Sequence, residues 1–153
     1  MENHIDQRWQ QRFEHFSRAF RLLRSALEDQ TVGDYNQLEQ EGLIQRFEYT
    51  FELAWKTLKD YLEYNGVQLE AANPRNVIKE CVNSGMFNSA ELNGEVFIEM
   101  MLARNALSHT YDFDRFREVI IRVQSEFLPQ LEQLYLYLLN KVIDTSTNNV
   151  KEH

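Results

Sequence analysis

The sequence predicts an all-α protein, arranged as an antiparallel up-and-down four-helix bundle with one extra short helix. The chain of 153 residues contains five Gly and two Pro, whereas Leu, Glu, Gln and Arg, which are strong helix formers, are abundant. Large apolar residues also recur at intervals of three and four, which is the period of an amphipathic helix. With 43% apolar residues, the chain can fill one substantial core.

The first predicted helix begins near Ile5 and continues to about Leu27. Its apolar stripe follows steps of four and three residues and comprises Ile5, Trp9, Phe13, Phe16, Phe20, Leu23 and Leu27. Arginines lie between the stripe residues, at Arg8, Arg12, Arg18, Arg21 and Arg24. These arginines form either an ordinary solvated face or a docking surface for an anionic partner.

A loop and a second long helix are expected next. Residues 30–36 lack the helical period and contain Gly33, which favours a helix stop. The second helix is predicted from about Gln37 to Asn65, with Gly66 as its C-terminal stop. One face of this helix carries Leu43, Phe47, Phe51, Ala54, Leu58 and Tyr61. These residues form a second apolar stripe.

A short helix and a third long helix are predicted in the middle of the chain. Asn73 and Pro74 resemble an N-cap followed by proline at the first helical position, and the short helix they open ends near Gly85. Ser89 is the expected, weaker cap of the next helix. That helix leads to the segment over residues 104–111.

The last helix is expected to start between Asp112 and Asp114, where acidic side chains favour the positive end of the helix dipole. Pro129 removes one backbone donor and should kink or divide this helix. The domain is therefore predicted over residues 1–143, and the polar, aperiodic residues 144–153 are predicted to form a flexible tail. The stripe of the last helix consists of Phe116, Ile120, Val123, Phe127, Leu131, Leu134 and Leu138.

Charge and composition exclude several classes of protein. The formal net charge of −8 argues against broad, nonspecific coating of nucleic acid, although it leaves room for a local basic cleft. The sequence has no Gly-rich phosphate loop, paired-Cys zinc signature or alternating pattern of strands and helices, so no cofactor and no metal is expected. The single Cys81, the absence of a signal-like opening and the lack of about 18 consecutive apolar residues predict a cytoplasmic protein without a membrane span.

One segment concentrates groups that can do chemistry, Arg-Asn-Ala-Leu-Ser-His-Thr-Tyr at residues 104–111. Arg104 supplies a permanent cation whose planar fork suits phosphate. His109 titrates near neutrality and can take and return a proton, and Tyr111 adds a phenol. On paper, Arg104 and His109 suffice for metal-free cleavage of an RNA phosphodiester. His109 would act on the ribose 2′-hydroxyl or the leaving oxygen, while Arg104 would stabilise charge on the phosphorane oxygens.

Helical geometry leaves two arrangements open for this pair. Residues five apart on an unbroken helix point about 140° away from each other, because each residue turns the helix by roughly 100°. Either the helix ends near Ser108 and lets His109 swing round, or Arg104 and His109 from two chains combine across a dimer axis. By contrast, Arg104, Ser108 and Tyr111 have helical spacings of four and three and could line one groove.

A purely structural role for the segment is the competing interpretation. Arg104 could pair with Glu95 or Glu99 on its own helix. His109 could cap carbonyl groups at the end of that helix. The Tyr111 ring could pack while its hydroxyl forms a hydrogen bond.

The segment also resembles a known signature, the Arg-x4-His-x-Tyr pattern of the HEPN superfamily, here at residues 104–111. The helix over residues 42–56, GLIQRFEYTFELAWK, is similar to that of the nucleotidyltransferase substrate-binding proteins, the HepT-like branch of this superfamily. Asn-Pro-Arg at residues 73–75 and Ser-His-Thr-Tyr at residues 108–111 match the same branch. The resemblance extends over residues 9–142, and the combination of helix and short pattern makes it specific.

The resemblance implies a homodimeric helical bundle that is paired with a small minimal nucleotidyltransferase. In one description, such a bundle is a noncatalytic substrate-binding subunit of a two-component nucleotidyltransferase. In the other, it is the toxin of a toxin-antitoxin pair, in which Arg104 and His109 act as a metal-independent ribonuclease on RNA. The nucleotidyltransferase, as the antitoxin, then silences the nuclease by AMPylation of Tyr111. AMP would place bulk and negative charge where an RNA phosphate must sit.

The resemblance also suggests roles for neighbouring residues. Asn105 and Ser108 would be supporting groups that orient the phosphate or the His109 ring. Trp55 and Lys56 would either line the groove or hold helices together, and packing is the expected role of Trp55.

Overall fold

The computed structural model describes residues 2–28, 31–108 and 111–151, and these ranges are helical without a β-strand. The helices are α1 (Glu2–Glu28), α2 (Gln37–Tyr64), α3 (Pro74–Asn83), α4 (Gly94–Leu107), α5 (Phe113–Arg122) and α6 (Leu128–Lys151). A 3-10 turn over Val32–Asp34 follows α1, and a π-helical stretch over Val123–Phe127 joins α5 to α6. The predicted all-α class is confirmed. The up-and-down four-helix topology and the homodimer stay predictions.

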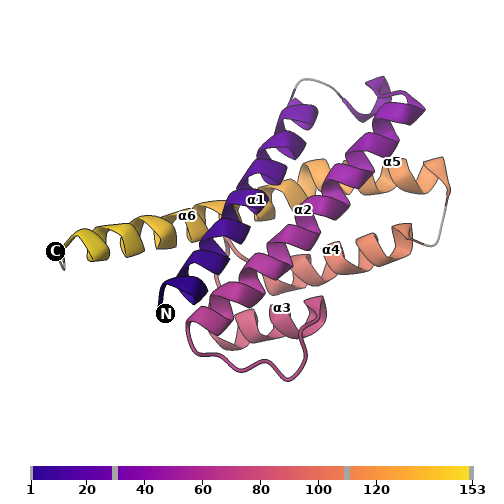
Figure 1. The fold of residues 1–153 in the computed structure, drawn as a ribbon. Coiled ribbons are helices and arrows are strands. Elements are labelled where there is room, and N and C mark those ends of the chain that lie inside the picture. Colours follow the sequence, from indigo (N-terminus) through magenta and orange to yellow (C-terminus); the bar gives the residue numbers. More distant parts are fainter. Residues whose placement is uncertain (1, 29–30, 109–110, 152–153) are drawn as a thin grey trace.

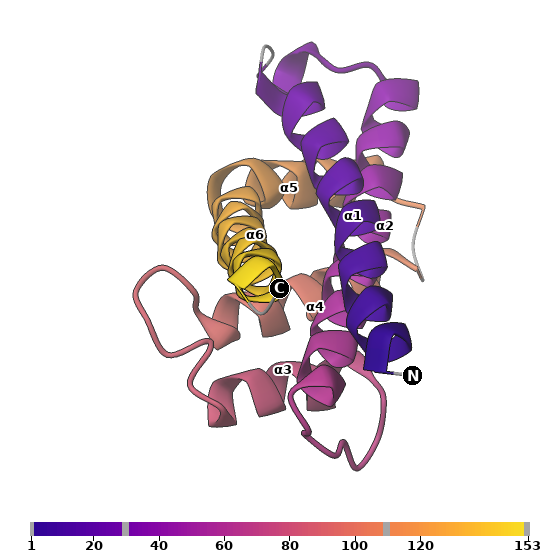
Figure 2. The same ribbon diagram turned by 60° about the vertical axis from the view of Figure 1, so that its left-hand side comes forward.

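Helix α2 contacts α1, α3, α4 and α5. It runs antiparallel beside α1, and the two form one side of the molecule in both views (Figures 1 and 2). In Figure 1, α5 and α6 pass behind this pair, where α5 contacts α2 and α6 contacts α1. The shorter α3 and α4 pack on each other and on α2. The border between α2 and α4 is where the candidate site lies.

The predicted apolar stripes form the core. Every stripe residue of α1 from Trp9 to Leu27 is buried, and the α2 stripe is buried from Leu43 to Leu58. Phe47 of α2 stacks on Phe127 with ring centroids 5.6 Å apart, which ties α2 to the segment between α5 and α6. All stripe residues of the last helix are buried as well, namely Phe116, Ile120, Val123, Phe127, Leu131, Leu134 and Leu138. The helical period therefore identified most of the core, although Tyr61 is only partly buried and the side chain of Ile5 lies outside the described part.

Side-chain caps open three of the helices, and the cap predicted at Asn73 is confirmed. Asn36 and Glu39 form a reciprocal capping box at the start of α2. The Asn73 side chain accepts the N–H of Asn76 at the start of α3, with proline in the first helical turn. Asp112 caps α5. These side chains satisfy backbone donors that the first helical turn leaves without partners.

The predicted start of the third long helix is wrong. Ser89 does accept a backbone N–H, that of Leu92, but only within a turn, and the N-cap of α4 is Asn93. The Asn93 side chain accepts the N–H of Glu95, while its backbone N–H donates to the Gln130 side chain on α6 at 2.9 Å. This second contact comes from a distant part of the chain, and it fixes the later start.

Helices α2 and α3 each end just before a glycine, as the sequence predicted. Gly66 and Gly85 have φ values of +85° and +89°, respectively, just after α2 and α3. This left-handed conformation is accessible to glycine without the steric cost that other residues incur. Both stops agree with the sequence-based expectation.

Pro129 divides the last helical segment as predicted, through a π-helical stretch. Pro129 has no N–H to donate to the carbonyl four residues earlier. Just before it, the backbone hydrogen bonds change to the π-helical pattern, in which the N–H of Leu128 donates to the carbonyl of Val123, five residues back. The break therefore takes the form of one wide turn between α5 and α6.

Helix α6 continues to Lys151, past the boundary at residue 143 that the sequence predicted. The residues expected to form a polar tail from position 144 are thus helical as far as Lys151. Within the described part of the chain, no helix combines the length and apolar character needed to span a membrane. Cys81 is buried, and burial raises the pKa of its thiol to about 12.

Candidate functional site

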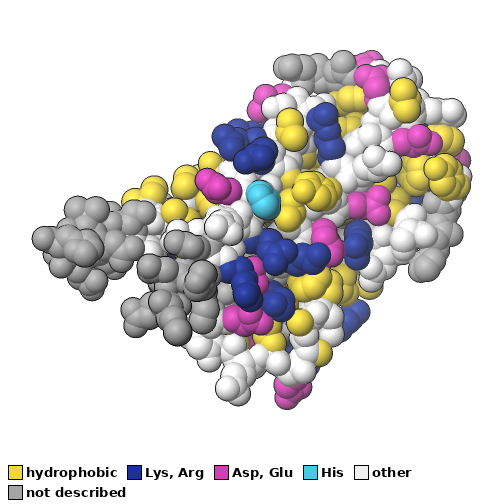
Figure 3. Space-filling model, viewed as in Figure 1, with side chains coloured by type: hydrophobic (Ala, Val, Ile, Leu, Met, Phe, Trp, Pro, Cys, Tyr) yellow, Lys and Arg dark blue, Asp and Glu magenta, His cyan; other side chains and the backbone are white. Residues whose placement is uncertain are grey.

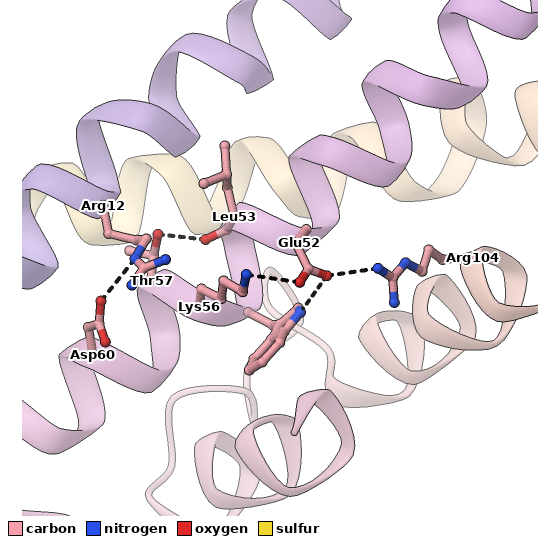
Figure 4. A network of polar contacts seen from close by, with 8 residues as sticks. Arg12, Glu52, Leu53, Lys56, Thr57, Asp60 and Arg104 are labelled. Atoms are coloured by element: carbon pink, nitrogen blue, oxygen red, sulfur yellow. Dashed lines mark hydrogen bonds and ion pairs between the residues drawn. The ribbon is translucent and has the colours of Figure 1, made fainter. Parts of the chain in front are cut away.

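Arg104 is anchored at the border between α4 and α2. It lies in the last turn of α4, and its Nη2 donates to Oε2 of Glu52 on α2 at 2.9 Å (Figure 4). The structural interpretation of the sequence named Glu95 and Glu99 as partners, but neither pairs with Arg104 among the contacts of the described residues. Glu99 instead pairs with Arg122 at 2.6 Å. Arg104 thus links two helices and does not brace its own.

Glu52 also binds two residues of its own helix. Lys56 Nζ lies 3.1 Å from Oε1 of Glu52, and Trp55 Nε1 donates to Oε2 at 3.0 Å (Figure 4). Trp55 is buried, which agrees with the expected packing role, and Lys56 Nζ lies 5.9 Å from its ring centroid. Glu52, Trp55, Lys56 and Arg104 are called the Glu52 network below. Three residues proposed from sequence therefore meet at one carboxylate.

Two carboxylates that the charge of Arg104 influences have pKa shifts in opposite directions. Burial raises the pKa of Glu52, but hydrogen bonds from Trp55 and Lys56 and the charge of Arg104 outweigh it, so the net pKa is lowered. For Glu48, one turn earlier on α2, burial raises the pKa more than the charge of Arg104 lowers it. Glu52 is therefore the more acidic of the two carboxylates, and it is the one that pairs with Arg104.

A groove lies beside this network, where α2 meets the end of α4 and the start of α5. Its volume is about 530 Å³, and it is lined by Glu41, Ile44, Gln45, Glu48, Leu107, Ser108, Tyr111 and Phe116. Ser108 and Tyr111 both line this groove, but Arg104 does not. Tyr111 lies beyond the end of α4, so the helical face predicted for these three residues does not form. The charged groups among the described lining residues are both carboxylates, so the groove is acidic.

Tyr111 is presented to solvent at the rim of the groove. It is 86% exposed, and its ring lies against Phe116 with centroids 6.2 Å apart. The phenol can therefore be reached from outside. This exposure differs from the packed ring that the structural interpretation expected.

The end of α4 agrees with one of the two arrangements considered for Arg104 and His109. The helix ends at Leu107 with Ser108 as its C-cap, and the Ser108 hydroxyl donates to the Asn105 carbonyl at 2.7 Å. Asn105 and Ser108 are both exposed. His109, together with Thr110, lies outside the described residues, so its position relative to Arg104 stays a prediction.

The site has one clear chemical capability. A guanidinium has five N–H donors, and one bond to Glu52 leaves others for an anion. Arg104 retains 33% of its side-chain exposure, so those donors are accessible. Among the described residues, no group of three or more His, Cys, Asp or Glu side chains is placed to hold a metal ion.

Glu52 and Glu48 were missed by the sequence analysis. The signal was present, because Glu48, Glu52 and Lys56 follow one another at four-residue intervals and so share one helical face. An acidic residue four positions before a lysine on a helix ordinarily indicates a surface ion pair. Nothing local distinguishes such a pair from one that also reaches another helix.

Comparisons with known proteins agree with the fold and the sequence pattern. The profile of the family described as nucleotidyltransferase substrate binding protein like matches residues 11–140. A protein from Thermus thermophilus of known crystal structure is 28% identical, with a TM-score of 0.68. That match covers 80% of this chain and 98% of the Thermus chain. A search of curated proteins gives no match.

Proposed function

Because the chain belongs to the nucleotidyltransferase substrate-binding protein-like family, we propose that it is the partner of a minimal nucleotidyltransferase and that AMP transfer to Tyr111 controls it. In the same proposal, Arg104 and His109 form a metal-independent ribonuclease site of the HEPN type. The chain is then the toxin of a toxin-antitoxin pair, and the nucleotidyltransferase is its antitoxin.

The observation that carries this proposal is the exposure of Tyr111 close to Arg104 in sequence. Tyr111 is 86% exposed and follows the end of α4, whose last turn carries Arg104. A second protein can reach such a phenol without unfolding the bundle. In the transfer, the Tyr111 oxygen attacks the α-phosphorus of ATP, pyrophosphate leaves, and the phenolic proton is released.

The proposed cleavage requires a cation and a proton carrier at one phosphodiester. His109 takes the proton of the ribose 2′-hydroxyl, the 2′-oxygen forms a bond to phosphorus, and the bond to the 5′-oxygen breaks. A protonated imidazole returns a proton to the leaving 5′-oxygen. Arg104 binds the phosphorane oxygens, and the Glu52 network holds its guanidinium in place for that role. The products are a 2′,3′-cyclic phosphate and a 5′-hydroxyl.

AMPylation would act on this site through charge and bulk. The new phosphodiester carries a negative charge that repels an RNA phosphate, and the adenosine occupies space beside it. In a homodimer, where Arg104 of one chain works with His109 of the other, the modification would block a shared cleft. The homodimer is part of the proposal.

The test combines intact-mass analysis with an RNA-cleavage assay. The purified protein is assayed before and after incubation with its cognate nucleotidyltransferase and ATP. We expect a mass gain of whole AMP units and loss of cleavage. Tyr111→Phe should abolish labelling, whereas Tyr49→Phe, which changes another exposed tyrosine, should not. His109→Ala should abolish cleavage and leave labelling intact. Labelling of Tyr111→Phe, or equal cleavage by His109→Ala, would overturn the respective assignment.

The acidic groove favours a second candidate, a noncatalytic substrate-binding subunit. Glu41 and Glu48 face a groove of about 530 Å³ beside Ser108 and Tyr111, which suits a small cationic substrate. Under this alternative, the purified protein shows no cleavage over a broad RNA panel. The nucleotidyltransferase then modifies a small cationic compound in the presence of this chain, and Glu41→Gln or Glu48→Gln weakens that reaction.

A further inference from the structure

A basic surface lies on α1 and α2, outside the groove beside Tyr111. Figure 3 shows Lys and Arg side chains gathered over these two helices. Part of this area surrounds a recess of about 120 Å³ between the two helices. The residues that line it are His15, Arg18, Ala19, Leu22, Arg46 and Tyr49, and together they are called the α1–α2 recess. Its described charged residues are all cationic, in a chain whose net charge is −8.

The cations of the α1–α2 recess are not neutralised by carboxylates. Within the described part of the chain, neither Arg18 nor Arg46 forms an ion pair, and Arg46 donates to the backbone carbonyl of Leu22 at 3.1 Å. That bond orients the guanidinium and leaves its charge uncompensated. The cations further along the same helices differ, because Arg12 pairs with Asp60 and Lys56 pairs with Glu52. The recess therefore has positive charge that is available to a ligand.

The recess also offers an aromatic and apolar surface beside this charge. Tyr49 is 59% exposed, and Leu22 is 51% exposed. Cations that track a phosphate backbone, together with an aromatic ring on which a base can stack, are the two elements that bind single-stranded nucleic acid. A membrane surface would instead meet a protruding apolar face, and here the apolar side chains line a depression.

We propose that the α1–α2 recess binds single-stranded RNA, with phosphates at Arg18 and Arg46 and a base against Tyr49. This inference rests on the proposed ribonuclease function. The recess would hold the RNA substrate at a distance from the bond that is cleaved. The recess would concentrate RNA on an otherwise acidic protein, so that cleavage depends on a local field and not on the net charge.

The experiment measures binding of a fluorescent single-stranded RNA by anisotropy, in an otherwise wild-type chain carrying His109→Ala so that the RNA stays intact. The test variant is Arg18→Ser with Arg46→Ser. The matched control is Arg75→Ser with Lys79→Ser, which removes the same charge from α3, where neither residue forms an ion pair among those described. We expect roughly tenfold weaker binding for the test pair and little change for the control. The slope of log affinity against log salt should fall by about 1.4 for two lost phosphate contacts.

A second variant separates binding from folding. Arg46→Ser removes the bond to Leu22, so Arg18→Ser with Tyr49→Ala is tested as well, because neither of these side chains makes a hydrogen bond in the described structure. Loss of the ring should weaken binding by about fivefold or more. Thermal unfolding must match the wild type for each variant that is compared.

The outcomes distinguish this inference from the proposed function. Equal weakening in test and control pairs, or competition by inorganic polyphosphate as strong as by RNA per phosphate, overturns the RNA assignment. If the wild-type chain cleaves RNA while the recess variants bind RNA normally, the proposed role of the recess is wrong and the proposed nuclease function is supported. If RNA binding depends on the recess but the wild-type chain cleaves no RNA, the proposed role of the recess is supported and the proposed nuclease function is wrong.

Discussion

Two carboxylates of α2, Glu52 and Asp60, each pair with an arginine from another helix, yet they are built differently. The arginines are alike, because the side chains of Arg104 and Arg12 are 33% and 34% exposed. The acids are not, because Glu52 retains 28% of its side-chain exposure and Asp60 only 2%. Glu52 accepts from three donors, whereas Oδ1 of Asp60 has no hydrogen-bond partner in the described structure. Figure 4 shows both pairs side by side on α2.

The difference separates a pair that holds the fold from one that can take part in binding. If its arginine leaves, Glu52 can be hydrated and keeps Lys56 and Trp55. Asp60 would stay buried, with only Lys59 Nζ 3.7 Å from Oδ1. A buried charge without compensation costs far more than an exposed one. Loss of the arginine should therefore cost less stability at Glu52 than at Asp60.

The largest predicted effect is that of Arg12→Ala on stability. It leaves the Asp60 carboxylate buried, and we expect a loss of about 3 kcal/mol in the free energy of unfolding. Urea denaturation at pH 7 measures it. The control is Arg18→Ala, which removes an unpaired cation from the same helix and should change stability by less than about 0.5 kcal/mol.

Arg104→Ala should cost less, about 1 kcal/mol, because the Glu52 that it leaves behind is partly hydrated and keeps two donors. The same denaturation experiment measures this loss. A loss as large as that of Arg12→Ala would show that burial of the acid does not separate the two pairs.

Glu52→Gln should change how the stability of the protein depends on pH. The pKa of Glu52 is lowered in the folded protein from its ordinary 4.5, so the ionised side chain stabilises the fold above pH 4.5. This contribution is lost as pH falls through the lower, folded-state pKa. Wild type and variant should therefore differ in melting temperature at pH 7 and converge in acid. A constant difference across this range would contradict the assignment.

Lys56→Gln tests the local part of the Glu52 network. Lys56 and Glu52 are four residues apart with the acid nearer the N-terminus, and such pairs contribute about 0.3–0.5 kcal/mol. We expect a loss of that size, reduced by added salt. A loss above that of Arg104→Ala would mean that Lys56 carries the network.

Glu48→Gln should have the smallest effect on stability, and unlike the other variants it should stabilise the protein. Burial raises the pKa of Glu48, so its ionised form is destabilising, and wild-type stability falls as pH rises from 4.5 through the folded-state pKa. The neutral amide avoids this cost. The variant should melt slightly higher at pH 7 and lose its advantage in acid, whereas a lower melting temperature at pH 7 would contradict the prediction.

The helices could be read from the sequence because their determinants are local. The spacing from Trp9 to Leu27, the cap at Asn73 and the left-handed Gly66 each act within a few residues. The start of α4 could not be read in this way. Ser89 and Asn93 are both acceptable caps, and a contact with Gln130 accompanies the later start.

The candidate site was only partly predictable for the same reason. The segment at residues 104–111 and the pair Trp55 and Lys56 were identified, but the residue that joins them was not. Glu52 meets Arg104 from 52 positions away, and that contact depends on how α2 and α4 are rotated about their axes. No local pattern encodes such a rotation. Only when the helices are packed is it clear that Glu52, which pairs with Lys56 on its own helix, also pairs with Arg104.

The π-helical stretch over Val123–Phe127 has a consequence for chain length. A π turn closes over one residue more than an α turn, so the path from α5 to α6 contains a surplus residue. Ser125 lies there, exposed, and bonds only to the carbonyl of Ile121 among the described contacts. The surplus residue gives room to the Pro129 ring, which an ordinary α turn would bring against the carbonyl four residues earlier. A chain one residue shorter at this point would close the turn onto the proline ring, so the extra residue and Pro129 belong together.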